Sequence, residues 1–202
     1  MVNDELQRLF VALELPAAWT QAIGELQERM RAALTASLGN EAPRLRWTRP
    51  EATHLTLKFL GGTPRSKSGP IDGALREAVT GASGLTLSLG KIGAFEDRRG
   101  PRVVFVTVEG DVEELQALAS RVDTSLSREG FPRERRPFQP HLTLGRLPDD
   151  IPPDRKRRAG EVVSALRAPR PGPHRFRSLS LMRSYLERGG ARYEQVRSYR
   201  LA

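Results

Sequence analysis

The tetrapeptide His-Leu-Thr-Leu occurs twice in this chain, at residues 54–57 and 141–144. Each copy alternates polar and apolar side chains, which is typical of a half-buried β-strand. In the first strand we expect Leu55, Leu57 and Phe59 to point into a core, while the histidine and threonine share the other face. The two copies contain two of the chain's three histidines. The sequence therefore predicts two strands that each present an imidazole beside a hydroxyl.

Each copy of the motif follows a predicted strand and a predicted helix. Residues 8–15 alternate as a strand and residues 17–38 carry apolar side chains at helical spacing. Residues 103–108 form a β-branched run, and Asp111 is placed to cap a helix that continues to about Arg128. This repeated order indicates a diverged internal duplication. We expect an α+β protein of two similar lobes with a cleft between them.

The rest of the chain adds shorter elements. Further strands are predicted at residues 45–48, 85–89, 176–184 and 193–201, and further helices at 71–79 and 153–166. Gly189 and Gly190 separate the last two strands, which predicts a terminal hairpin. The basic run Arg155–Arg158 could grip an RNA backbone or form a solvated helix face, and we expect the second.

The charge balance favours a polyanionic partner. The chain has 33 basic and 24 acidic residues, a formal net charge of +9, and arginine supplies most of the positive charge. Because arginine pairs bidentately with phosphate and stacks on bases, RNA or DNA is the simplest partner. An arginine-rich genome composition would give the same count, so charge alone leaves both explanations open. The absence of cysteine excludes disulfides, thiol catalysis and cysteine metal sites.

Several other classes of protein lack support in the sequence. The first ten residues lack the order of a secretory signal, and no apolar run approaches the ~20 residues that span a bilayer. There is no His-Glu-x-x-His motif, no carboxylate cluster with ligand spacing and no P-loop. We therefore expect a soluble cytoplasmic protein with no membrane partner, no metal and no cofactor.

Two opposed imidazoles suit the cleavage of a phosphate ester. One can activate water while the other protonates the leaving oxygen, and an ordinary histidine pKa near ~6.5 allows both forms around neutral pH. Thr56 and Thr143 would donate hydrogen bonds to the non-bridging oxygens. A single motif is better explained as structural strand residues, whereas two in a chain with three histidines favour a site. His174 lies outside any such motif, and we leave it out of the site.

The chain resembles the 2H phosphoesterases, which are named for two His-x-Thr-x motifs, and among them the RNA 2′,3′-cyclic phosphodiesterases. The matching segments run in the family's order: Arg8–Phe10, His54–Gly61, Gly93–Phe95, Pro140–Arg146, and Ser184 through Tyr193 to Leu201. The resemblance implies two pseudo-symmetric lobes, each an antiparallel sheet with helices on its outer face, in a single bilobed domain over residues 1–202. The active-site cleft would lie between the lobes.

The resemblance also implies roles for particular residues. His54 would be the proton donor to the 3′ oxygen and His141 the proton acceptor that activates water, an order that the sequence alone does not fix. Arg146 would hold the phosphate, although strict alternation places it on the face opposite His141. Phe95 would stack on a base or belong to the core. Arg8, Ser184 and Tyr193 correspond to positions that line the family's cleft, and are equally ordinary surface residues.

The function implied is metal-independent hydrolysis of RNA 2′,3′-cyclic phosphate ends to 2′-phosphates. The RNA would include tRNA fragments, and joining of 2′-5′ linkages is a related activity of the family. We expect a monomer. Two alternatives stay open at this stage. One is a phosphodiesterase acting on a small cyclic nucleotide-like metabolite or a 2′-5′ oligonucleotide, and the other is a non-catalytic module that binds RNA ends.

Overall fold

The computed structural model describes residues 5–187 and 190–202. The strands are β1 (Leu6–Glu14), β2 (Arg46–Trp47), β3 (His54–Pro64), β4 (Leu85–Asp97), β5 (Gly100–Gly110), β6 (His141–Arg146), β7 (His174–Phe176), β8 (Ser178–Glu187) and β9 (Gly190–Arg200). The helices are α1 (Ala17–Leu38), α2 (Ser68–Val79), α3 (Val112–Arg128) and α4 (Pro153–Ser164). Short 3₁₀ turns occupy Gly39–Glu41, Pro50–Ala52 and Arg65–Lys67.

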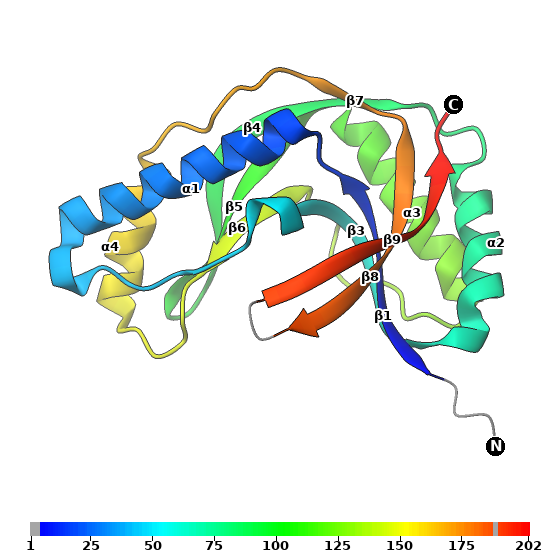
Figure 1. Ribbon diagram of the computed structural model, residues 1–202, viewed down its shortest axis with the longest axis horizontal. Helices are drawn as coiled ribbons and strands as arrows, with labels where there is room; N and C mark the ends of the chain where they lie inside the picture. The colour runs from blue at the N-terminus through cyan, green and yellow to red at the C-terminus, as the bar shows by residue number, and fades with distance from the viewer. Residues whose placement is uncertain (1–4, 188–189) are drawn as a thin grey trace.

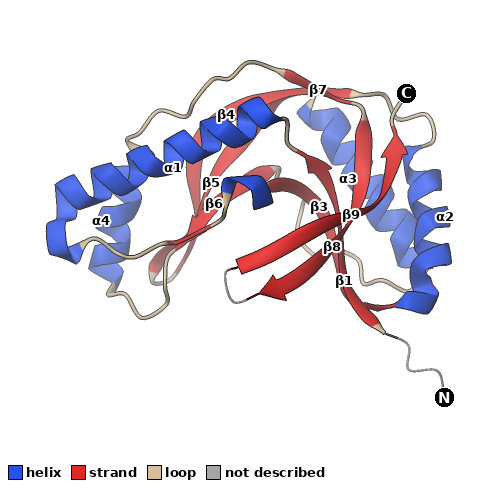
Figure 2. Ribbon diagram, viewed as in Figure 1, coloured by secondary structure: helices blue, strands red, loops and turns tan. Residues whose placement is uncertain are grey.

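The strands form two antiparallel sheets. A four-stranded sheet has the order β3-β1-β8-β9, and a five-stranded sheet has the order β2-β6-β5-β4-β7. Helices α1 and α4 lie against the five-stranded sheet, whereas α2 and α3 pack together against the four-stranded one (Figures 1 and 2). This arrangement confirms the predicted α+β fold of two lobes, each an antiparallel sheet covered by helices.

The two motif strands belong to matching strand–helix–strand units. In β1–α1–β3 the two strands pair in the four-stranded sheet, while α1 crosses to the five-stranded sheet. In β5–α3–β6 the strands pair in the five-stranded sheet, while α3 crosses to the four-stranded sheet. Each unit thus sends its helix to the other lobe.

The buried face of α1 explains its position. Its apolar side chains recur every three or four residues, and Trp19, Ile23, Leu26 and Met30 are almost completely buried. The indole nitrogen of Trp19 donates a hydrogen bond to the carbonyl oxygen of Gly172, at 3.1 Å. The helix therefore fastens the long connector before β7 to the five-stranded sheet.

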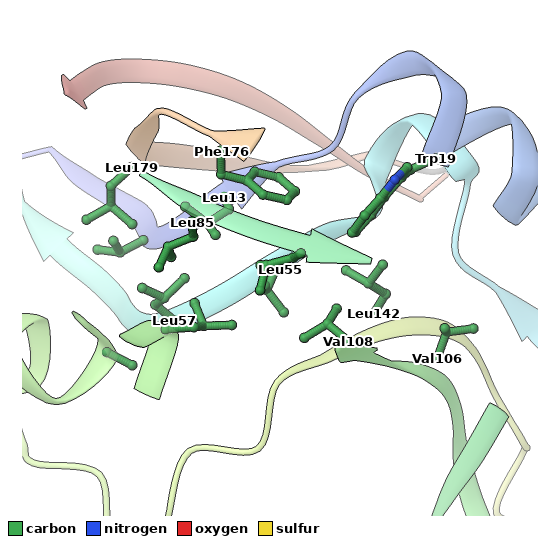
Figure 3. Close-up of a cluster of buried hydrophobic side chains, with 14 of the residues drawn as sticks. Leu13, Trp19, Leu55, Leu57, Leu85, Val106, Val108, Leu142, Phe176 and Leu179 are labelled. Atoms are coloured by element: carbon green, nitrogen blue, oxygen red, sulfur yellow. The ribbon is translucent and has the colours of Figure 1, made fainter. Parts of the chain in front are cut away.

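One hydrophobic core runs through both lobes. Figure 3 shows side chains of the two sheets in a single cluster with Trp19 of α1. The four-stranded sheet contributes Leu13, Leu55, Leu57 and Leu179, and the five-stranded sheet contributes Leu85, Val106, Val108, Leu142 and Phe176. Burial of this shared apolar surface holds the sheets in a fixed relation, which in turn fixes the groups on their opposed faces.

Both motif strands contain a β-bulge at the same place. The pairing of β3 with β1 skips Leu57, and the pairing of β6 with β5 skips Leu144. A bulge inserts one extra residue and so reverses the alternation of faces beyond it. The prediction that Phe59 points into the core is therefore wrong: its side chain is 67% exposed.

Two local predictions near the sheet ends need correction, and part of a third lies outside the described residues. The predicted strand 176–184 is two strands, because β7 ends at Phe176 in one sheet and β8 begins at Ser178 in the other. Gly189 of the predicted hairpin turn lies outside the described residues, although β8 and β9 pair as predicted. Asp111 precedes α3 without capping it, because its carboxylate accepts a hydrogen bond from the amide of Thr86 at 2.7 Å.

Helix α4 also differs from the prediction. Lys156 is completely buried, so the run Arg155–Arg158 is not simply a solvated face. Arg155 and Arg158 both form ion pairs with Glu41. In the described part of the chain, no helix has the length and apolar character that crossing a bilayer requires.

Candidate active site

A cleft of about 990 Å³ opens between the two sheets. It is lined by all six of the site residues predicted from the sequence. They are His54 and Thr56 of β3, Phe95 of β4, and His141, Thr143 and Arg146 of β6. The third histidine, His174, begins β7 and is not among the lining residues, which agrees with its exclusion from the site.

The imidazole of His54 is held from three sides. Its Nδ1 atom lies 2.9 Å from the carbonyl oxygen of Ala52. The ring of Phe10 stacks on it at a centroid distance of 4.5 Å, and the ring of Tyr193 meets it edge-on at 4.8 Å. Because a carbonyl can only accept, Nδ1 carries a proton, which leaves Nε2 as the nitrogen that can exchange one with a ligand.

The imidazole of His141 has a matching environment in the other lobe. Its Nδ1 atom lies 2.7 Å from the carbonyl oxygen of Gln139, again two residues earlier in the chain. The rings of Phe95 and Phe105 meet it edge-on at centroid distances of 4.8 and 5.4 Å. Both histidines therefore present Nε2 with the same backbone restraint and a pair of aromatic neighbours.

The surroundings of both histidines favour the neutral imidazole. Burial lowers the pKa of His54 to about 4, despite the opposing effects of the Ala52 carbonyl and of Glu14. Burial also lowers the pKa of His141; the Gln139 carbonyl opposes this change and Arg146 adds to it. The expectation of ordinary histidine pKa values is therefore wrong for the free protein, in which both rings are neutral near pH 7.

The bulge in β6 resolves the placement of Arg146. Strict alternation would direct this side chain away from His141, but the extra residue at Leu144 returns it to the cleft.

Gln27 of α1, which is buried, donates hydrogen bonds to the carbonyl oxygens of Leu144 and Thr48, at 2.9 and 2.7 Å. Gln27 was not among the residues predicted for the site; a polar residue within the apolar stripe of a helix is the signal that would have found it.

Phe95 lies beside His141 at the cleft. Its ring packs against Phe105 at a centroid distance of 4.3 Å as well as edge-on to the imidazole. Phe95 is partly buried, so its environment is intermediate between the two that were predicted, an exposed ring that stacks on a base and a core residue.

Arg8, Ser184 and Tyr193 are neighbours across three strands. Arg8 of β1 pairs in register with Ser184 of β8, which pairs with Tyr193 of β9. Residues that pair in register share a face of the sheet. Of the three, Tyr193 lines the cleft and contacts Phe10 and His54.

A buried ion pair holds the segment that leads into His141. The amine of Lys58, whose side chain is 1% exposed, lies 2.5 Å from Asp123 Oδ1 and 2.7 Å from the carbonyl oxygen of Pro132. Asp123 also accepts a hydrogen bond from the amide of Glu134 at 3.1 Å. Lys58 thus joins β3 to α3 and to the loop before β6. This contact of Lys58 was not predicted, because a lysine in a strand is usually a solvent-facing residue.

Side chains that could bind a metal do not cluster in residues 5–187 and 190–202. Within these ranges no group of three or more histidine, aspartate or glutamate side chains could hold a metal ion. The chemistry that the cleft offers from its own residues is proton transfer by imidazole and hydrogen bonding by hydroxyl and guanidinium groups.

The pattern of the chain matches a known family model. The model described as the 2'-5' RNA ligase superfamily matches residues 15–187, which include both motifs. The chain belongs to this superfamily. Its members among curated proteins include one from Methanothermobacter thermautotrophicus named RNA 2',3'-cyclic phosphodiesterase. That protein is 28% identical over 96% of this chain and 98% of its own.

Solved structures share the fold. TT0787 of Thermus thermophilus superposes with a TM-score of 0.70 at 24% identity, over 96% of this chain and 97% of its own. E. coli LigT, crystallised in complex with 3'-AMP, superposes with a TM-score of 0.66 at 26% identity, over 98% of this chain and 99% of its own. The family model and the likeness to LigT agree with the resemblance to the 2H phosphoesterases that the two motifs indicate.

Proposed function

We propose that this chain hydrolyses RNA 2′,3′-cyclic phosphate ends to 2′-phosphates, with His54 and His141 as the acid and the base. The observation that carries the proposal is the matched pair of imidazoles, one from each lobe, with Nε2 available in one cleft. The name of the Methanothermobacter relative supports the substrate, and the net charge of +9 suits RNA.

The reaction needs one proton taken and one returned. Nε2 of His141 accepts a proton from water as the water oxygen bonds to phosphorus. The bond between phosphorus and the 3′ oxygen breaks, and protonated His54 gives that oxygen its proton. The phosphate stays on the 2′ oxygen. Thr56, Thr143 and Arg146 stabilise the charge that develops on the non-bridging oxygens.

The lowered histidine pKa values fit this scheme once substrate binds. An anionic phosphate close to an imidazole favours its protonated form. The substrate therefore raises the pKa of the histidine that acts as the acid, while the other histidine stays neutral as the base. Water-excluding aromatic rings on both sides strengthen this electrostatic response.

Joining of 2′-5′ ends follows from the same geometry. If the 5′-hydroxyl of a second RNA replaces water, His141 accepts its proton and the products are a 2′-5′ linkage and a free 3′-hydroxyl. The superfamily description supports this second activity.

The direct test is incubation with a short RNA that ends in a 2′,3′-cyclic phosphate, with EDTA present. We expect a 2′-phosphate, and loss of the product with His54→Ala or His141→Ala while circular dichroism stays unchanged. His174→Ala is the matched control and should retain full activity. Turnover by either motif variant would contradict the proposal, and a requirement for added metal would contradict its metal-independent form.

The alternatives give different results in the same assay. A metabolite phosphodiesterase would cleave a small cyclic nucleotide and would not be inhibited by long RNA. A non-catalytic module would bind end-phosphorylated RNA and leave the cyclic end unchanged. Sedimentation of the purified chain tests whether it is a monomer, as we propose.

A further inference from the structure

Phe59 is an exposed aromatic side chain inside the cleft. Four large apolar side chains are strongly exposed among the described residues: Leu6, Phe59, Leu186 and Val196. Of these only Phe59 lines the cleft, and 67% of it is accessible to solvent. An exposed phenyl ring within a site is unfavourable in water unless a ligand covers it.

The bulge of β3 brings Phe59 to the cleft. Phe59 is five residues after His54, just as Arg146 is five residues after His141, and both strands skip a leucine in between. The two side chains are therefore counterparts in the two lobes, one aromatic and one cationic. Phe10 is near both rings, since its centroid is 6.1 Å from that of Phe59 and 4.5 Å from that of His54.

Phe95, the aromatic residue predicted to meet a base, is less free to do so. Its ring contacts Phe105 and His141 at centroid distances of 4.3 and 4.8 Å, and it is partly buried. A phenyl ring that already packs against two other rings has less exposed surface on which a base can stack. Phe59 is the aromatic ring with the larger open surface on this cleft.

The loop before β6 and helix α3 also contribute residues to this cleft, and one of them is a cation. Arg136 and Phe138 from the loop before β6 and Gln116 and Ser120 from α3 line the same cleft. Arg136 is exposed, and it forms no ion pair with any described residue. This loop is anchored to β3, because Pro132 accepts a hydrogen bond from Lys58, the residue before Phe59.

We propose that the part of the cleft between Phe59 and Arg136 is a nucleotide subsite, where Phe59 stacks on a base of the RNA 3′ end and Arg136 pairs with an adjoining phosphate. This subsite rests on the proposed function, because the reacting phosphate must lie between the two histidines. Stacking on an aromatic ring tolerates every base, since each has a π-face. The subsite therefore selects for a nucleobase next to the cyclic end without reading its identity.

The test combines variants of the protein with changes in the RNA. Phe59→Leu keeps an apolar side chain without a ring, Phe59→Trp keeps a ring, and Leu186→Ala removes an exposed apolar side chain outside the cleft. Each protein is assayed on cyclic-ended RNA with all its bases, and on RNA that lacks the base of the last or of the next-to-last nucleotide.

On complete RNA we expect Phe59→Leu to raise KM roughly 5- to 150-fold with little change in kcat, because stacking binds substrate and transition state alike. Leu186→Ala should behave like the wild type, and Phe59→Trp should retain most of the affinity that Phe59→Leu loses. On RNA without the engaged base, Phe59→Leu should make little further difference. Equal losses on complete RNA and on both abasic RNAs would overturn the subsite.

Arg136 is tested by salt dependence. Arg136→Gln should weaken binding and reduce the slope of log KM against log salt by about one ion, since one phosphate contact is lost. An unchanged slope would contradict its part in the subsite. If the wild type cleaves no cyclic end, the proposed function fails; the affinities of the same proteins for RNA with a terminal 2′-phosphate then decide the subsite separately.

Discussion

The ring of Phe10 stacks on the imidazole of His54, with centroids 4.5 Å apart and an interplanar angle of 30°. Phe10 comes from β1, which pairs with the motif strand β3, and Tyr193 of β9 closes another side of the imidazole. This aromatic enclosure keeps water from the ring, and the loss of solvation lowers the pKa of His54 to about 4. The charge of a histidine in this site is thus governed by what occupies the cleft.

The pH dependence of kcat/KM is the first prediction. In the proposed scheme only the form of the free protein with one histidine protonated and the other neutral reacts, and this form is populated below neutral pH because both pKa values lie below the ordinary value of 6.5. We expect a bell-shaped profile with its optimum below pH 6.5 and a tenfold fall per pH unit on the alkaline side. Initial rates from about pH 4 to about pH 8, with circular dichroism at each pH, measure it. An optimum above pH 7 would contradict the effect of burial.

Stability should fall in acid because of His54. Its pKa is about 4 in the folded protein and near 6.5 in the unfolded chain, so the unfolded chain binds more protons between these values. Stability is therefore lost as the pH falls through this window. Between pH 7 and about pH 4.5 the wild type should lose about 2 kcal/mol more than His54→Asn in urea denaturation. Equal losses in the two proteins would mean that His54 titrates normally.

Arg146 should matter through its charge and its shape. Arg146→Ala removes a guanidinium from the phosphate, and we expect kcat/KM to fall by roughly 10²–10³ with the fold unchanged. Arg146→Lys should recover only part of this loss, because an ammonium cannot pair bidentately. Arg157→Ala, on the exposed part of α4, is the matched control. Wild-type rates in Arg146→Ala would remove this residue from the site.

The pair formed by Lys58 and Asp123 should be sensitive to single substitutions. Lys58→Met leaves Asp123 without its closest partner, and we expect the free energy of unfolding to fall by roughly 3–5 kcal/mol. The double variant Lys58→Met/Asp123→Leu should regain part of this stability. Breaking the exposed pair of Arg192 and Glu187 should have a much smaller effect, because solvent screens both charges. Urea titrations compare the variants, and equal effects at both pairs would refute the distinction.

The shared core predicts one cooperative unfolding transition. We propose that residues 1–202 form a single domain, because Leu55 of one sheet and Leu142 of the other belong to the same apolar cluster. Differential scanning calorimetry should give one peak with equal calorimetric and van't Hoff enthalpies. Two separable peaks would mean that the lobes unfold independently.

The positions of His54 and His141 were predictable, but two of their neighbours were not. Strict alternation predicted that Phe59 lies in the core and that Arg146 points away from the cleft. In the structure, a bulge of the same kind in each strand places both side chains in the cleft. A bulge changes hydrogen-bond register over one residue, and its signal is not present in the polar and apolar pattern. The family resemblance led to the right position for Arg146, where the pattern did not.

Long-range polar contacts were also beyond the pattern. The bounds of α1 at Ala17 and Leu38 agree with the prediction, because the helix is long and strongly periodic. Gln27 within it pairs with the backbone of Leu144, more than a hundred residues away, and Lys58 pairs with Asp123 on another element. Such partners depend on tertiary structure, which residue spacing along one element does not encode.

The crossing of α1 and α3 to opposite lobes has a consequence for the integrity of the chain. A cut between α2 and β4 would leave β2 of one sheet with the first fragment and β8 and β9 of the other sheet with the second. Neither fragment would contain a complete lobe, and each would lack a helix that covers its own sheet. The arrangement is the intramolecular counterpart of a domain-swapped dimer. The two halves can therefore acquire their native structure only by folding around each other.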